Sequence, residues 1–351
     1  MKAKKFLSLA MTVLMLTGIL SAVSFAKEPL ALEAGLDELC EQFEKGKGPE
    51  ADGYSIDYRY FSPVKEDDTT KYPLVVWLHG MGDGEYEGKQ LTEQEIALWS
   101  SAEYQSRFKN SGGAFIIAPR SVEEEELYWD DCLIYPLRAA LDDFIEQHRE
   151  NIDVSRIYVG GYSMGGKMTL KMAVAYPEFF AAAFPICPAW APDKEAAARL
   201  KDMPLWLTSG KTDPLVSYSC LVMPTWRNIL SQSNVPDLCR LSSLSVTADE
   251  KGIPFLSAHF SWIAVNHDMF SHKNGDYPFM TTVNGNGEEL TLTYPDGMIS
   301  WLSSFSGSYD GTPADDSGNP EATNPSAHIS FFEAIKLWLC ELLEMIKGMF
   351  K

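Results

Sequence analysis

Residues 156–166 read Arg-Ile-Tyr-Val-Gly-Gly-Tyr-Ser-Met-Gly-Gly, and the rest of the chain is organised around them. A β-branched and aromatic run ends in glycines, Ser163 follows, and a helical pattern covers 167–176. The stretch predicts a strand, a sharp turn and a helix, with Gly161-x-Ser163-x-Gly165 at the corner. Glycines are needed there because larger side chains would collide in so tight a turn. We expect a nucleophile elbow that exposes the Ser163 hydroxyl, and a glycine-rich structural turn is the alternative.

Buried strands alternate with helices on both sides of this corner. Several of the strand patterns are continuous apolar runs, which are typical of strands buried on both faces. Strand patterns cover 54–60, 72–78, 114–119, 181–187 and 205–209, and helical patterns cover 133–149 and 194–201. The alternation predicts an α/β fold with a mainly parallel central sheet and helices on both faces. Sites in such sheets lie at the carboxyl ends of the strands.

Three further patterns predict local structure. Thr92 and Glu95 have the spacing of a capping box and predict a helix that begins there and runs toward Phe108. Residues 238–265 predict an added hairpin, and residues 281–293 predict another, with Asn-Gly-Asn-Gly at its turn. Both extra hairpins could lie near the site and cover it.

The first 26 residues predict a secretory signal peptide. Three lysines precede an apolar core that ends at Leu20, and Ser24-Phe25-Ala26 supplies small residues for cleavage. The apolar core is too short for a comfortable membrane span. Cleavage after Ala26 removes three lysines and no acidic residue, so the formal net charge changes from −20 to −23. We expect a secreted, extracellular protein, and its acidity argues against nucleic acid or an anionic surface as partner.

The rest of the chain divides into three predicted parts. Residues 27–306 are long enough for a catalytic domain with a large core and contain no internal repeat. Residues 307–330, rich in Pro, Asp, Asn, Gly and Thr, predict a flexible linker. Residues 331–351 predict an amphipathic helix with a wide apolar face. That face could dock on the domain or a second chain, or could lie in the membrane interface as a peripheral membrane contact.

All six cysteines lie beyond the predicted cleavage point. Six cysteines allow 15 pairings. Buried thiols are as plausible as disulfide bonds, because a core of this size can stabilise the fold without disulfides. The most plausible bridge joins Cys220 and Cys239, which bracket one helical stretch.

A serine hydroxyl needs a base to act as a nucleophile at neutral pH, and the base needs an orienting acid. In a fold with this elbow the chain order is Ser, then Asp or Glu, then His. Asp213 follows the strand pattern 205–209 and is the candidate acid, although an Asp before a proline also forms turns. The sequence therefore predicts Ser163 and Asp213 as two members of a triad.

The base must be a histidine that follows Asp213, which excludes His79 and His148. His259 lies inside the apolar run 255–265, where a core or strand histidine is expected. His267 comes directly after that run, where a loop should begin, and is the predicted base. His272 is the alternative, and His328 falls in the linker.

Two backbone N–H groups are candidates for an oxyanion hole, which acyl transfer requires. Met164 follows the nucleophile, and Met81 lies in the glycine-rich loop after the strand pattern 72–78. Trp129 and Trp190 lie in loops after two buried strands and are the candidate substrate-binding residues, although tryptophans are also often buried in ordinary packing.

Five stretches carry a resemblance to a known family: 73–80, 161–166, 176–187, 210–213 and 266–268. Across about 55–305 the chain resembles the α/β-hydrolase superfamily, in particular secreted esterases labelled "predicted peptidase" or polyhydroxybutyrate-depolymerase-like, close to feruloyl and acetylxylan esterases. The resemblance implies hydrolysis through an acyl-enzyme by Ser163, Asp213 and His267. It implies no cofactor and no metal. The sequence departs from the family at Asn266, where a glycine is usual, and by a longer segment between the acid and the base.

Three functions agree with these observations. A serine carboxylic ester hydrolase is favoured, because short-chain or aromatic acyl esters, including carbohydrate-linked ones, need no machinery beyond the triad. A serine peptidase of the same fold is the second, although it usually needs a propeller or cap, and no repeat for one is present. A catalytically silent binding module is the third, and the complete Ser, Asp, His order counts against it.

Overall fold

A computed structural model describes residues 33–85, 87–121, 128–247, 257–271, 279–293 and 295–314 of the protein. The chain divides into compact units at 1–37 and 38–351, and all the described strands belong to the second. The predicted signal peptide, the predicted helix 331–351, His272, His328 and Cys340 lie outside the described residues. In the described part of the chain, no helix has the length and apolarity to cross a membrane.

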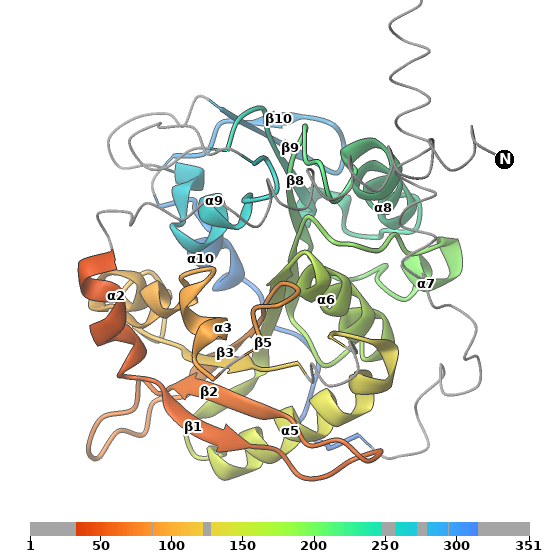
Figure 1. The fold of residues 1–351 in the computed structure, drawn as a ribbon. Helices are drawn as coiled ribbons and strands as arrows, with labels where there is room; N and C mark the ends of the chain where they lie inside the picture. The colour runs from red at the N-terminus through yellow and green to blue at the C-terminus, as the bar shows by residue number, and fades with distance from the viewer. Residues whose placement is uncertain are drawn as a thin grey trace, which may run out of the picture. The chain divides into compact units, whose positions relative to one another are not determined.

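The described residues form a ten-stranded sheet in the order β1-β2-β4-β3-β5-β6-β7-β8-β9-β10 (Figure 1). The strands from β4 through β8 in that order pair in parallel, whereas β1, β2, β9 and β10 pair antiparallel at the two edges. The bounds are β1 (Glu44–Lys47), β2 (Asp57–Phe61), β3 (Tyr72–Leu78), β4 (Phe115–Pro119), β5 (Ile152–Tyr162), β6 (Ala182–Ile186), β7 (Trp206–Gly210), β8 (Arg240–Leu244), β9 (Met280–Asn284) and β10 (Glu289–Leu290).

Helices cover both faces of the sheet, with α5, α6, α7 and α8 on one side and α3, α9 and α10 on the other (Figure 1). The bounds of the described helices are α2 (Glu33–Cys40), α3 (Lys89–Thr92), α4 (Ala102–Gln105), α5 (Ile134–Gln147), α6 (Met164–Ala175), α7 (Lys194–Ala198), α8 (Met223–Leu230), α9 (Trp262–Asn266) and α10 (Met298–Leu302). Helix α5 shows why the layers form, because Leu137, Leu141 and Phe144 share one face and are all buried.

The predicted α/β architecture is confirmed. Every residue of β3, β4, β6 and β7 is buried, as their continuous apolar runs predict. The hairpin expected over 281–293 is also present, since β9 and β10 pair antiparallel and Gly287 adopts a left-handed φ of 81° at its turn. It lies at the sheet edge, beyond β8.

The hairpin predicted over 238–265 is wrong. Its first part is β8, which pairs in parallel with β7, and its last part is the helix α9. The apolar residues of this segment therefore extend the central sheet and cover one of its faces.

The predicted helix start at Thr92 is also wrong. Thr92 is the last residue of α3, and Glu95 is a buried residue with a left-handed φ of 57°. The helix α4 begins later and is capped by Ser101, whose side chain accepts from the Tyr104 N–H.

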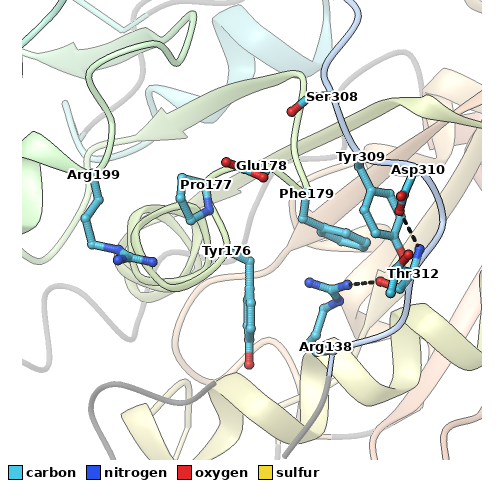
Figure 2. A pocket seen from close by; sticks show the side chains of 11 residues that line it. Arg138, Tyr176, Pro177, Glu178, Phe179, Arg199, Ser308, Tyr309, Asp310 and Thr312 are labelled. Atoms are coloured by element: carbon cyan, nitrogen blue, oxygen red, sulfur yellow. Dashed lines mark hydrogen bonds between the residues drawn. The ribbon is translucent and has the colours of Figure 1, made fainter. Parts of the chain in front are cut away.

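The predicted linker starts too early at 307. The Gly307 N–H donates to the Ser155 carbonyl over 2.7 Å, and the Ala314 N–H donates to Asp142 over 3.0 Å. The Arg138 guanidinium, paired with Asp142, lies 3.8 Å from the Phe179 ring centroid and donates to the Thr312 carbonyl (Figure 2). Residues 307–314 are therefore held on the catalytic domain, and the remainder of 307–330 lies outside the described residues.

The suggested disulfide is wrong as well. Cys220 and Cys239 are both free thiols. Cys239 is buried, and its Sγ lies 3.8 Å from the Met203 carbonyl oxygen.

Candidate active site

Ser163 occupies the corner between β5 and α6, as the glycine pattern predicts. Its backbone has a φ of 58° and a ψ of −110°, an uncommon conformation for a residue with a side chain. The Ser163 N–H donates to the Ile186 carbonyl over 2.9 Å, and its own carbonyl accepts from the Lys167 N–H over 2.9 Å. These bonds to β6 and α6 hold the strained corner in place.

Close contacts explain the glycines around Ser163. A side-chain carbon added at Gly165 would lie 1.9 Å from the Leu78 carbonyl oxygen, and one added at Gly161 would lie 2.5 Å from the same atom. Because backbone cannot move aside like a flexible side chain, only glycine fits at both positions. The absence of side chains lets the first turn of α6 sit directly against the carboxyl end of β3.

Asp213 lies just beyond the carboxyl end of β7, where it was expected. Its Oδ1 accepts from the N–H groups of Leu215 and Val216 over 2.8 and 2.9 Å. These bonds form the expected turn, and they also fix the carboxylate so that Oδ2 faces a histidine. Asp213 therefore forms a turn with one oxygen and keeps the other oxygen for the histidine.

That histidine is His259, and the prediction that His267 pairs with Asp213 is wrong. His259 Nδ1 lies 2.8 Å from Asp213 Oδ2, and both side chains are buried. The His259 ring also packs against Tyr162, the residue before Ser163, with ring centroids 4.8 Å apart. The structure thus brings Asp213 and His259 to the elbow.

His267 pairs with a different carboxyl group. Its Nε2 lies 2.6 Å from Glu95 Oε2, and both side chains are almost fully buried. The neighbouring Asn266 donates to the Gln94 carbonyl over 2.5 Å. Asp268 forms an ion pair with Arg107 at 2.9 Å. Residues 266–268 therefore fasten α9 to residues 94–107.

The apolar run around His259 gave a misleading signal. Polar Ser257, His259 and Ser261 alternate with apolar neighbours, which is the pattern of a half-buried strand. In the structure these residues form turns, with the His259 N–H donating to Ser257 Oγ, and α9 begins at Trp262. The two serines, which favour turns, were the available signal for a loop.

The glycine-rich loop after β3 lies beside the elbow. A side chain at Gly80 would meet the Tyr162 ring at 2.8 Å, so the loop and the residue before the nucleophile are in close contact. Met81 follows Gly80, and its side chain is 57% exposed. Met164 begins α6, where the first backbone N–H groups have no intrahelical acceptor. Both predicted oxyanion donors therefore lie in segments that border Ser163.

His79 supports this loop as a neutral ring. Its Nε2 accepts from the Ser121 N–H over 3.0 Å, and its Nδ1 donates to the Gly80 carbonyl over 2.6 Å. Burial lowers the pKa of His79 from 6.5 to about 4. The ring thus stays uncharged at neutral pH and fixes the direction of the loop.

We expect His79 to make the fold sensitive to acid. The unfolded chain binds a proton near pH 6.5 and the folded protein only near pH 4, so the stabilisation is complete above pH 6.5 and is lost as pH falls toward 4. The loss from this group is about 3 kcal/mol. The free energy of unfolding, measured with urea at pH 7 and pH 4.5, should differ less between the two pH values for His79→Gln than for wild type. An equal difference would contradict this role.

Trp129 and Trp190 differ in position. The Trp129 ring is fully buried and donates to the His79 carbonyl over 2.9 Å, so the prediction that it contacts substrate is wrong. It supports the glycine-rich loop from inside the protein. Trp190 is partly exposed, and the Lys171 ammonium lies 4.2 Å from its ring centroid.

A cavity at the other end of α6 is separate from this site. Arg138, Tyr176, Phe179, Arg199 and Tyr309 are among its lining residues (Figure 2). The length of α6, about 18 Å, separates that end of the helix from Ser163. The Arg138 charge is paired with Asp142, and the Arg199 guanidinium donates to the carbonyls of Val174 and Ala175.

Comparisons with known proteins agree with this geometry. The model of the phospholipase/carboxylesterase family matches residues 134–249, which include Ser163 and Asp213 and end before His259. A solved thermostable esterase is 25% identical with a TM-score of 0.56, and the match covers 77% of this chain and 64% of that one. The chain thus spans less than two thirds of that esterase. No curated protein sequence matches significantly.

Two further solved structures are more distant. An acylaminoacyl peptidase from Pyrococcus horikoshii is 17% identical, with a TM-score of 0.40 and coverage of 54% of this chain and 35% of that one. A ferulic acid esterase from Anaeromyces mucronatus, solved with ferulic acid, is 18% identical with a TM-score of 0.45, and the match covers 54% of this chain and 79% of that one. The sheet order, the corner at Ser163, the family match and the thermostable esterase together show that the chain has an α/β-hydrolase fold.

Proposed function

We propose that this protein is a serine hydrolase of the carboxylesterase type, acting through an acyl-enzyme. The observation that carries the proposal is the buried Asp213–His259 pair, 2.8 Å apart, beside the strained Ser163 corner. Ser163 is the nucleophile, His259 the general base and Asp213 the group that orients it. The base differs from the one that the sequence predicted.

The proposed reaction follows from the proton positions. Asp213 accepts from His259 Nδ1, which leaves the Nε2 lone pair to take the Ser163 proton as the oxygen attacks the ester carbonyl. The N–H groups of Met164 and Met81 stabilise the oxyanion. The protonated ring then gives its proton to the leaving alcohol. Water then attacks the acyl-enzyme by the same steps and releases the acid. Neither acylation nor deacylation uses a cofactor or metal.

For the substrate we propose short-chain or aromatic acyl esters, including carbohydrate-linked ones. Trp190, partly exposed, is the remaining candidate to bind the acyl group. We propose that the enzyme acts outside the cell after removal of residues 1–26, and that residues 331–351 make a peripheral membrane contact. The acidic charge fits small ester substrates better than nucleic acid.

A fluorophosphonate probe tests the proposal directly. The Ser163 oxygen should displace fluoride and form a stable phosphonyl ester, because the triad activates this hydroxyl above all others. We expect one adduct per chain, located on Ser163 by peptide mass spectrometry, together with complete loss of p-nitrophenyl acetate hydrolysis. Ser163→Ala is the control and should take up no probe. Labelling of another serine in wild type would overturn the assignment.

A further inference from the structure

Three side chains of metal-binding type meet in a buried cluster at the end of β6. Cys187 Sγ lies 3.7 Å from His259 Nδ1, which lies 2.8 Å from Asp213 Oδ2. One ligand atom from each of the three lies within 4.8 Å of the other two. The ester hydrolysis proposed above uses the histidine and the aspartate but gives the thiol no role.

The backbone holds the Cys187 thiol firmly in this position. The Cys187 N–H donates to the Thr208 carbonyl over 2.8 Å, and its φ of 33° is unusual for a residue with a side chain. Burial, followed by the Asp213 charge, raises the pKa of Cys187 well above its usual value. The thiol is therefore protonated at neutral pH and is a poor nucleophile in its own right.

We propose that Cys187, Asp213 and His259 form an inhibitory site for a thiophilic divalent cation, with Zn²⁺ as the best fit. A thiolate, an imidazole nitrogen and a carboxylate oxygen are the donors that Zn²⁺ takes in proteins. In a tetrahedral zinc site the sulfur and nitrogen ligands lie about 3.6 Å apart. The Sγ–Nδ1 distance of 3.7 Å matches that spacing, and the Asp213–His259 contact of 2.8 Å has to open by about 0.5 Å.

Charge balance favours the ion in this buried place. The carboxylate of Asp213 and the thiolate of Cys187 would together neutralise the two positive charges of the ion. Mg²⁺ and Ca²⁺ prefer sets of oxygen ligands and should not compete. Because Cys187 is fully buried, the His259 side chain has to move to admit the ion, so inhibition should develop over time.

The ion would inhibit by changing the tautomer of His259. It takes the Nδ1 lone pair, the proton from Nδ1 moves to Nε2, and the Cys187 thiol releases its proton to solvent. No electron is transferred. With a proton on Nε2 and the metal on Nδ1, the ring has no free lone pair to accept the Ser163 proton. This consequence rests on the proposed role of His259, whereas binding of the ion does not.

The test combines inhibition with a direct view of the ligands. Zn²⁺ should inhibit p-nitrophenyl acetate hydrolysis by wild type with one ion bound per site, and Mg²⁺ should not. Cys187→Ala and Cys187→Ser should each raise the half-inhibitory Zn²⁺ concentration, relative to their own metal-free rates. A rise of about 100-fold or more is expected, because losing even a hydrogen-bond partner of a metal ligand typically lowers metal affinity 10- to 100-fold, and Cys187 is proposed as a ligand itself. Cys239→Ser, which removes another buried thiol, is the matched control and should behave as wild type.

Two spectroscopic measurements on wild type keep the test independent of the variants' folding. Co²⁺ in place of Zn²⁺ should show a thiolate-to-cobalt charge-transfer absorption. X-ray absorption of the zinc form should show one sulfur at about 2.3 Å. Absence of a sulfur ligand, or equal inhibition of Cys187→Ala, would overturn the site. A sulfur-ligated ion with undiminished turnover would instead overturn the role of His259.

Discussion

Replacing His259 by alanine should lower kcat for p-nitrophenyl acetate by about six orders of magnitude, as loss of a triad base does elsewhere. The reason is that Asp213 pairs with this ring at 2.8 Å, so no other described histidine is oriented for the task. A residual rate of about 10³- to 10⁴-fold over water should survive through the oxyanion donors. Steady-state kinetics on protein with an unchanged Tm measures the effect.

His267→Ala is the matched control, because it removes a second buried histidine that also pairs with a carboxyl group. The change deprives the buried Glu95 of its 2.6 Å contact, which should cost about 2–5 kcal/mol of stability. The Tm should therefore fall, whereas kcat of the folded enzyme should stay within about tenfold, because His267 pairs with Glu95 and lies outside the proposed triad. If His267→Ala lost activity and His259→Ala kept it, the assignment of the base would be reversed.

The contrast between these two histidines shows what the sequence can and cannot predict. The elbow was predictable because the glycines, Ser163 and the strand before them lie within a few residues of one another. Asp213 was predictable because it follows a buried strand directly. Each of these features depends on local geometry, which periodicity and turn chemistry describe well.

The base depended on contacts between distant segments. Alternation around His259 fits a strand as well as a series of turns, and only its packing against Asp213 and Tyr162 decides between them. Glu95 shows the same limit. Its spacing from Thr92 is that of a capping box, but its partner is His267, 172 residues away. A short polar motif predicts a local bond only when no tertiary partner competes for the side chain.

The tryptophans illustrate a third limit. Trp129 follows a buried strand, as residues of an active site do in this architecture, yet its ring is fully buried beneath the glycine-rich loop. Sequence position placed it at the correct edge of the sheet. Whether a ring at that edge faces substrate or supports a loop depends on its side-chain direction, which position does not determine.

Asp213→Asn should lower kcat by about four orders of magnitude while keeping the loop that carries it. An asparagine oxygen can still accept from the N–H groups of Leu215 and Val216, so the turn is preserved. The amide nitrogen, however, would donate to His259 Nδ1 and place the ring proton on Nε2. With its proton on Nε2, the ring could no longer accept the Ser163 proton. This is the same tautomer that we expect zinc to impose.

Asp268→Asn controls for the loss of a buried carboxylate. Asp268 is buried and forms an ion pair with Arg107, but it lies outside the proposed triad. We expect a lower Tm and a kcat within about tenfold of wild type, because the ion pair acts on stability and not on the reacting atoms. A drop of less than tenfold in Asp213→Asn would show that this carboxylate does not set the tautomer. In that case the Asp213–His259 contact would be structural, and the base would have to be sought elsewhere.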